Sequence, residues 1–175
     1  AALHALLEVW HDQGLRLVRF RSRLNGPGAE RVGATVAKAK ALGIEVLIDG
    51  SVELMLSTGA AGLHLPGKSL QSLVSRPVGL DRWWAVSCHD AQELAQATRL
   101  GVDFAVLGPV LPTMSHPGAP SIGWPRFAAL AASASFPVYA LGGLDLEAIS
   151  LAREHGAQGV AAIRAFLPNP HGVGA

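Results

Sequence analysis

The chain has 175 residues, of which 50% are hydrophobic and 15% are charged, and its formal net charge at pH 7 is +1. This length and apolar content suffice for one domain with a sizeable core. The balanced charge argues against binding to nucleic acid or to a membrane surface through bulk charge, and no apolar run is long enough to predict a membrane span. The single cysteine, Cys88, excludes a disulfide within the chain and fits a reducing compartment such as the cytoplasm. The first residues, AALHALLEVWHDQG, have no basic leader before their apolar part, so we expect no signal peptide.

Short apolar runs alternate with amphipathic segments along the chain. Most of the runs are continuously apolar, which is typical of strands buried on both faces of a parallel sheet. The predicted strands are 15–20, 45–49, 62–65, 83–87, 104–108, 137–143 and 159–163. The predicted helices are 1–12, 29–42, 51–58, 68–74, 90–99, 125–133 and 145–155.

Local signals support these boundaries. A glycine follows four of the helices, as expected of a helix stop: Gly14, Gly43, Gly101 and Gly156. Asp90 and Glu93 have the spacing of an N-terminal capping pair at the start of the helix 90–99. The chain therefore reads as repeated βα units.

Two architectures fit repeated βα units, a (β/α)8 TIM barrel and an open doubly wound sheet. The dinucleotide fingerprint G-x-G-x-x-G is absent after the first strand, which argues against the second. With seven strands and a helix at its start, the sequence predicts a barrel that lacks its first strand, which would lie upstream of Ala1. We expect one domain over 1–167 and a flexible tail over 168–175.

Polar residues gather where the predicted strands end, which is where (β/α)8 barrels carry their chemistry. Arg19, Arg21 and Arg23 alternate after the first strand and would share one face. Flanking apolar residues favour burial, so these arginines predict an anion site; solvated arginines on a surface edge are the alternative.

The strand 83–87 ends in a serine, a cysteine and a histidine. Ser87 and His89 share a face, and His89 is either a proton-transfer group or a structural histidine. Cys88 faces the other way and is expected to be a packed thiol rather than a nucleophile. His64 lies within an apolar strand, which favours a structural or supporting role.

Three further features bear on a binding site. Gly142-Gly143 and Ile163-Arg164 end the last two strands, where such barrels often bind phosphate through backbone N–H groups. The carboxylates Asp49, Glu53 and Asp103 lack the spacing of a metal site. Trp83 and Trp84 are expected to pack in the core.

Taken together, these residues resemble the thiamine-phosphate synthase family and its TenI-like relatives, which are small (β/α)8 barrels. The resemblance covers about residues 14 to 167. It is strongest in 86-VSCHDAQELAQATRLGVDFAVLGPVLPT-113 and 137-PVYALGGLDLEAISLAREHGAQGVAAI-163. It implies that the loop after the strand 104–108 closes over a thiazole phosphate, with Thr113 and Ser115 contacting it. The phosphate would lie on Gly142, Gly143 and the backbone near Ile163 and Arg164.

The synthase joins a pyrimidine pyrophosphate to a thiazole phosphate with Mg²⁺. In its Q-x-R-x-K pattern Arg21 matches, whereas Arg19 and Arg23 are altered but cationic. The lysine after the thiazole loop becomes His116. The N-D-R motif becomes Asp49-Gly50-Ser51, and the second metal-binding aspartate becomes Ser69. Without these carboxylates the pyrophosphate leaving group would lose its main electrostatic stabilisation, so we expect no metal.

One TenI-like branch catalyses a metal-free thiazole tautomerisation, and the histidine of its S-x-H motif matches His89. The resemblance thus gives three hypotheses: a tautomerase with His89 as acid and base, a thiamine-phosphate synthase that needs Mg²⁺, and a non-catalytic domain that binds a thiamine-related phosphate. The family also occurs behind a Nudix-type hydrolase domain, so a Nudix domain in the same full-length chain and a homo-oligomer are expected possibilities.

Overall fold

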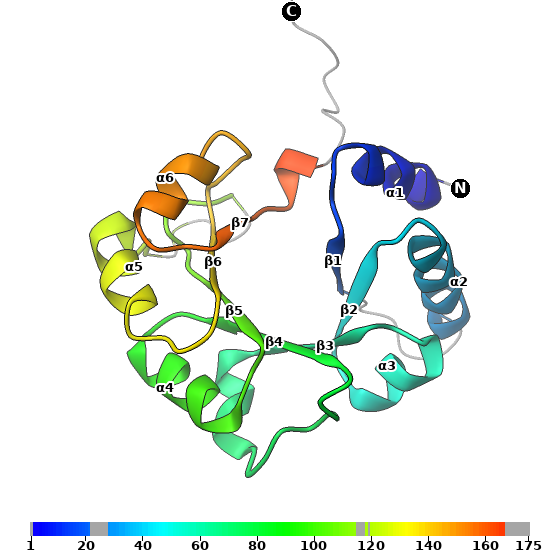
Figure 1. Ribbon diagram of the computed structural model, residues 1–175, viewed down its shortest axis with the longest axis horizontal. Coiled ribbons are helices and arrows are strands. Elements are labelled where there is room, and N and C mark those ends of the chain that lie inside the picture. The colour runs from blue at the N-terminus through cyan, green and yellow to red at the C-terminus, as the bar shows by residue number, and fades with distance from the viewer. Residues whose placement is uncertain (1, 22–27, 115–117, 119, 167–175) are drawn as a thin grey trace, which may run out of the picture. The chain divides into compact units, whose positions relative to one another are not determined.

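The computed structural model describes residues 2–21, 28–114, 118 and 120–166 (Figure 1). Seven strands follow one another along the chain, and each of them overlaps a predicted strand. They are β1 (Leu17–Arg21), β2 (Glu45–Asp49), β3 (Gly62–Pro66), β4 (Trp83–Cys88), β5 (Phe104–Leu107), β6 (Val138–Leu141) and β7 (Gly159–Ala161).

Helices separate the strands. The α-helices are α1 (Ala2–Asp12), α2 (Gly28–Ala41), α3 (Val52–Thr58), α4 (Ala91–Leu100), α5 (Gly123–Ala131) and α6 (Ile149–Glu154), and two 3₁₀ segments are η1 (Gly67–Ser72) and η2 (Arg164–Phe166). The four glycines predicted to stop helices all have left-handed φ angles, from 70° to 85°. A side chain at such a φ is strained, which is why these turns carry glycine.

The strand order decides between the two architectures. The sheet runs β1-β2-β3-β4-β5-β6-β7, in the order of the sequence. The pairs β1–β2, β2–β3, β5–β6 and β6–β7 are parallel. A doubly wound sheet reverses its strand order partway, whereas a (β/α)8 barrel adds each strand next to the last. The fold is therefore that of a (β/α)8 TIM barrel with seven of its strands described.

Packing divides the chain into two compact units. Unit 1 is Ala1–Val86 together with Leu100–Asp103, and unit 2 is Ser87–Arg99 together with Phe104–Ala175. The predicted single domain over 1–167 stays a prediction, and the predicted tail 168–175 lies outside the described residues.

Unit 1 has its core between its strands and helices. The central residues of β2, Val46, Leu47 and Ile48, are at most 2% exposed. Helix α2 packs on β2 and on α3, and α3 packs on β3 (Figure 1). Burying a leucine-sized side chain contributes about 1.5–3 kcal/mol, so these residues stabilise β2, which ends in Asp49.

Unit 2 has a smaller core of the same kind. Ala105 and Leu107 of β5, Ala140 of β6 and Phe127 of α5 are fully buried. Phe104 and Tyr139 meet edge to face with ring centroids 5.5 Å apart across the β5–β6 pair. The ring pair lies near the amino ends of β5 and β6, whereas the polar loops of unit 2 follow their carboxyl ends.

Three predictions need correction. The first strand is not buried on both faces, because β1 is at the end of the strand order among the residues that the structure describes and its odd-numbered residues are exposed. The helix predicted at 68–74 is the short 3₁₀ segment η1. The helix predicted at 145–155 begins later, because Asp145 accepts hydrogen bonds from the N–H groups of Glu147 and Ala148 and forms a turn there.

Within the described ranges, we find no helix with the length and apolarity that a membrane crossing requires.

Candidate functional site

Asp49 is the centre of a charged cluster in unit 1. Its Oδ2 accepts a hydrogen bond from Nη2 of Arg19 at 2.9 Å and lies 3.4 Å from Nε of Arg21. Its Oδ1 lies 3.3 Å from Nδ1 of His64. With His64 neutral, two guanidinium groups and one carboxylate leave this cluster with a net charge of about +1. Asp49 is thus an anionic partner of Arg19 and Arg21.

Strand register explains why these residues meet. Arg21 is paired with Asp49, and Asp49 is paired with His64, so the three residues form a row across β1, β2 and β3. Arg19 lies two residues before Arg21 on the same face. The prediction that Arg19 and Arg21 share a face is confirmed by their common contact with Asp49. Their side chains are 34% and 62% exposed, so Arg21 has room for a further anion.

The environment shifts the titration of both buried members. Burial by itself would raise the pKa of Asp49, but hydrogen bonds from His64 and Arg19 and the arginine charge outweigh it and lower the pKa to about 2. Burial lowers the pKa of His64 against the opposing effect of Asp49. His64 is 1% exposed and is therefore neutral at pH 7, with its Nδ1–H donating to the carboxylate.

The Mg²⁺ that the synthase reaction implies does not fit this cluster. Asp49 is already surrounded by two arginines and a histidine, and its neighbour at the expected metal position is Gly50. In the part of the chain that the structure describes, no group of three or more histidine, cysteine, aspartate or glutamate residues could hold a metal ion. A divalent cation needs several oxygen ligands free of competing cations, which this donor set does not supply.

In unit 2, His89 follows β4 and is held by Glu93 in the first turn of α4. Oε2 of Glu93 accepts hydrogen bonds from the backbone N–H of His89 at 2.8 Å and from its ring at Nδ1, at 2.9 Å. A carboxylate only accepts, so Nδ1 carries the proton and Nε2 is a free base in the neutral ring. The His89 side chain is 58% exposed and that of Glu93 is 15% exposed, so the free edge of the imidazole faces solvent.

The predicted capping pair is what places Glu93. Oδ1 of Asp90 accepts a hydrogen bond from the backbone N–H of Glu93 at 2.9 Å, and Glu93 returns its own bond to the N–H of His89. These two bonds satisfy two donors at the start of α4, with the second bond going to His89 rather than back to Asp90. The same carboxylate thus caps the helix and orients the histidine.

The two residues before His89 are buried. Ser87 is 8% exposed at the end of β4. Cys88 is 1% exposed, and burial, with the nearby charges of Glu93 and Asp90, raises the pKa of its thiol to about 12. A thiol with that pKa is protonated at neutral pH, which agrees with the expectation of a packed rather than a nucleophilic cysteine.

The loop after β5 packs directly on Gly142-Gly143 at the end of β6. The N–H groups of Val110 and Leu111 donate to the carbonyls of Leu141 and Gly142 at 2.8 and 3.1 Å. A Cβ added to Gly142 would lie 2.5 Å from Cβ of Pro109, and one added to Gly143 would lie 2.6 Å from the carbonyl oxygen of Pro112. Both glycines also have left-handed φ angles, of 102° and 69°. Glycine is therefore required at both positions for this loop to close on the strand end.

Not every predicted site residue is described. Arg23, Ser115 and His116 lie outside the described residues, and so does the side chain of Arg164. Thr113 is partly buried in the loop after β5, and Ile163, which follows β7, is 63% exposed. The roles of all these residues stay predictions.

Two functional contacts were missed by the sequence reasoning. Glu93 was interpreted only as a cap, although its i, i+4 spacing from His89 predicts that the side chains can meet on one helical turn. The pairing of His64 with Asp49 depends on the register of β2 and β3, for which the sequence carries no direct signal.

These features define a (β/α)-barrel protein with polar residues at the carboxyl ends of its strands. Residues 1–166 match the model of the thiamine monophosphate synthase family, and the chain belongs to that family. The family acts in thiamine biosynthesis, as the sequence resemblance implied.

Known proteins agree with this assignment. The chain is 35% identical over 166 residues to "Putative thiamine-phosphate synthase 2" of Aquifex aeolicus, covering 92% of this chain and 88% of the relative. It is 30% identical over 160 residues to "Thiamine-phosphate synthase" of Desulfitobacterium hafniense, covering 89% and 77%. The solved thiamine phosphate pyrophosphorylase of Pyrococcus furiosus shares the fold, with a TM-score of 0.74 at 20% identity, over 93% of this chain and 79% of that one.

Proposed function

We propose that this chain acts on a thiazole phosphate in thiamine biosynthesis, moving a proton within the thiazole through His89 without a metal. The observation that carries the proposal is the short contact of Glu93 with Nδ1 of His89, which leaves Nε2 free on an exposed ring edge. An imidazole with a fixed tautomer and a carboxylate behind it is suited to taking up and returning a proton.

In the proposed tautomerisation, Nε2 of His89 takes a proton from one ring carbon while the ring electrons shift. The imidazolium that forms is stabilised by the carboxylate of Glu93, since the Nδ1–H bond becomes stronger when the ring is charged. The imidazolium then returns the proton at a second ring atom. One proton leaves and one is returned, so neither an oxidant nor a metal is needed.

Backbone groups in unit 2 would bind the phosphate. The loop after β5 lies against Gly142 and Gly143, and the main chain at this strand end is the phosphate site that the family resemblance implies. Thr113 and Ser115 of the same loop are the expected side-chain contacts. In unit 1, the positive cluster around Asp49, with Arg21 exposed, is a second place suited to an anionic group.

A second candidate is the coupling reaction of thiamine-phosphate synthase. The names of the relatives favour this reaction over tautomerisation, since both curated relatives described above carry that name. The residues of this chain favour the first candidate, because Gly50 and Ser69 occupy the positions where the family has metal-binding aspartates and Asp49 is bound to two arginines.

One experiment separates the candidates. The purified chain is mixed with the thiazole carboxylate phosphate, without metal or pyrimidine, and the ring protons are followed by NMR. Conversion to the aromatic isomer that is lost in His89→Ala supports the tautomerase. Binding without conversion contradicts it and supports a non-catalytic domain. Product formed only after Mg²⁺ and pyrimidine pyrophosphate are added would establish the synthase instead.

The wider context of the chain is also a proposal. A Nudix-type domain in the same full-length protein, a homo-oligomer and a cytoplasmic location each stay predictions from the sequence resemblance and composition.

A further inference from the structure

A cavity of about 560 Å³ lies at the amino ends of β2, β3 and β4 in unit 1. Its lining includes Glu45, the first residue of β2, and Trp83, the first residue of β4. Asp49 is the last residue of β2, so the cavity and the candidate site of unit 1 are at opposite ends of the same strand. A volume of this size is typical of small-molecule sites.

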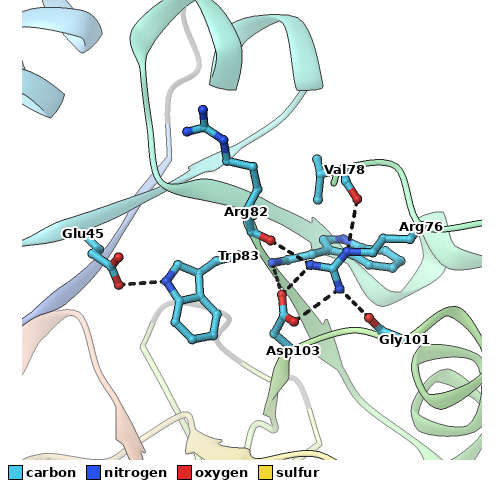
Figure 2. Close-up of polar contacts among 8 residues, drawn as sticks. Glu45, Arg76, Val78, Arg82, Trp83, Gly101 and Asp103 are labelled. Atoms are coloured by element: carbon cyan, nitrogen blue, oxygen red, sulfur yellow. Dashed lines mark hydrogen bonds and ion pairs between the residues drawn. The ribbon is translucent and has the colours of Figure 1, made fainter. Parts of the chain in front are cut away.

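Trp83 forms an apolar wall of the cavity. It was expected to pack in the core, and Trp84 does so with no exposure, but Trp83 is 42% exposed. The Nε1–H of Trp83 donates to Oε2 of Glu45 at 2.8 Å, which fixes the orientation of the indole (Figure 2). Leu80, which also lines the cavity, is 92% exposed. A fixed indole and an exposed leucine offer a ligand a flat apolar surface.

Two charged groups in the cavity lining, one negative and one positive, are available to bind a ligand. Asp103 is paired with Arg76, and Asp81 lies 3.5 Å from Arg82. Within the described ranges, the Glu45 carboxylate contacts the neutral indole N–H of Trp83 and no cationic side chain. Among the residues that the structure describes, the Lys40 ammonium has no hydrogen bond or ion pair. The cavity therefore presents one uncompensated carboxylate and one uncompensated ammonium.

A second feature strengthens the negative part of this field. The carboxyl ends of α2 and α3 lie at the cavity, since Gly43 and Gly59, which follow these helices, both line it. The carbonyl end of a helix carries a partial negative charge and favours a cation. A ligand ammonium is thus favoured near Glu45, while Lys40 is available to a ligand carboxylate or similar anion.

The wall of the cavity is rigid because the guanidinium of Arg76 is hydrogen-bonded to several groups of the protein. Its nitrogens donate to the carbonyls of Val78, Arg82 and Gly101 and to both carboxylate oxygens of Asp103 (Figure 2). The guanidinium also lies over the ring of Trp84, 5.7 Å from its centroid. These contacts hold the segment from Val78 to Arg82 in place, so a ligand would meet a largely preorganised surface.

We propose that this cavity binds a small zwitterion with an apolar body, for which a free amino acid with a flat side chain is the simplest model. Its ammonium would pair with Glu45, its carboxylate with Lys40, and its side chain would lie against Trp83 and Leu80. This proposal does not rest on the reaction proposed for His89, which belongs to unit 2.

Three probes test the charge requirement on the full chain. L-phenylalanine carries both charges, phenethylamine carries only the ammonium, and 3-phenylpropionate carries only the carboxylate. Binding is followed through the indole N–H signal of Trp83 in two-dimensional NMR, assigned with Trp83→Phe. We expect saturable shifts with phenylalanine below about 10 mM, and at least about fivefold weaker binding of the other two probes.

One variant removes each of the two charges, and a matched control accompanies each variant. Lys40→Met should abolish the preference for phenylalanine over phenethylamine, and Glu45→Gln, whose amide oxygen can still accept from Trp83, should abolish the preference over 3-phenylpropionate. Lys68→Met and Glu53→Gln change exposed residues outside the lining and should leave both preferences intact. His89→Ala should also bind phenylalanine unchanged.

Either of two results would overturn the proposal: no saturable shift of the Trp83 signal with phenylalanine, or preferences that persist in Lys40→Met and Glu45→Gln. Thermal unfolding of each variant shows whether it is folded. Because the readout is binding in unit 1, its failure is independent of whether the chain converts a thiazole phosphate.

Discussion

Each unit has a carboxylate near the end of a strand, and the two carboxylates are used differently. Asp49 in unit 1 contacts two arginines and a histidine, and the arginine charges compensate the charge of its carboxylate. Glu93 in unit 2 contacts one histidine, whose other nitrogen is left free. A carboxylate surrounded by cations stabilises the fold, whereas one behind a single exposed imidazole can support proton transfer.

The largest expected effect is on the free base of unit 2. His89→Ala should reduce turnover of the thiazole phosphate by up to about 10⁴-fold, because the proposed proton acceptor is removed. The matched control is His155→Ala, a histidine of unit 2 whose ring stacks on Trp124, with centroids 5.0 Å apart. NMR rates and ligand-induced shifts would be measured together. Full turnover in His89→Ala would contradict the view that Glu93 supports proton transfer whereas Asp49 only stabilises the fold.

The reactivity of Cys88 reports first on the burial of its thiol and then on the negative charges of Glu93 and Asp90. With its thiol pKa raised to about 12, the folded chain should react with iodoacetamide at pH 8 about 10³-fold more slowly than the chain in urea. Since the sequence has one cysteine, mass spectrometry follows this residue alone. Equal rates in both states would show that Cys88 is neither buried nor electrostatically shielded.

Removing the charge of Glu93 tests the orienting role. Glu93→Gln keeps an oxygen that can accept from Nδ1 but loses the charge that stabilises the imidazolium, so we expect about a tenfold fall in turnover with ligand binding retained. A purely capping role would instead lower the thermal stability and leave the pH profile of turnover unchanged. Glu147→Gln, an exposed glutamate of unit 2, is the control.

The smallest effect is expected on stability in unit 1. Asp49 has a pKa of about 2 in the folded chain and an ordinary value near 3.8, so acid protonates the unfolded state first. The stabilisation, about 2 kcal/mol, is complete above pH 4 and is lost as the pH falls toward 2. Urea unfolding followed between pH 2 and 7 should show this loss in the native chain and not in Asp49→Asn.

The control for this series is Asp12→Asn, an exposed aspartate of α1. Its profile should follow that of the native chain. A native profile that stays flat below pH 4 would mean that the contacts with Arg19 and His64 contribute little to the folded state. Acidification below about pH 6.5 should also cost stability through His64, whose folded pKa is lowered, because the unfolded state takes up that proton first.

The sequence predicted the strands well because continuous apolar runs between glycine stops carry a strong local signal. Each of the seven strands lies within two residues of its predicted start. The segment 68–74 was wrong as an α-helix, since a stretch that short cannot be told from a 3₁₀ turn by its pattern. The burial of β1 was also wrong, because burial depends on the neighbouring strands and not on the apolar content of the strand alone.

The positions of the candidate site residues were predictable only where a short sequence spacing, such as the strand period of two, determines which residues lie together. The period of two placed Arg19 and Arg21 on one face, and the capping spacing placed Glu93 at the start of α4. The partners of Asp49 depend on the register of three strands, which the sequence does not state. Arg76 lies in an irregular segment without a motif, so its saturated hydrogen bonding could not be foreseen.

The route of the chain through unit 1 has a consequence for its synthesis. The chain leaves this unit after Val86, builds Ser87–Arg99 of unit 2, and returns with Leu100–Asp103. Arg76 reaches its carboxylate only on that return, since its partner is Asp103. A nascent chain that has emerged from the ribosome only as far as β4 therefore holds an arginine without its counter-ion. Unit 1 can reach its final packing only after part of unit 2 has been synthesised.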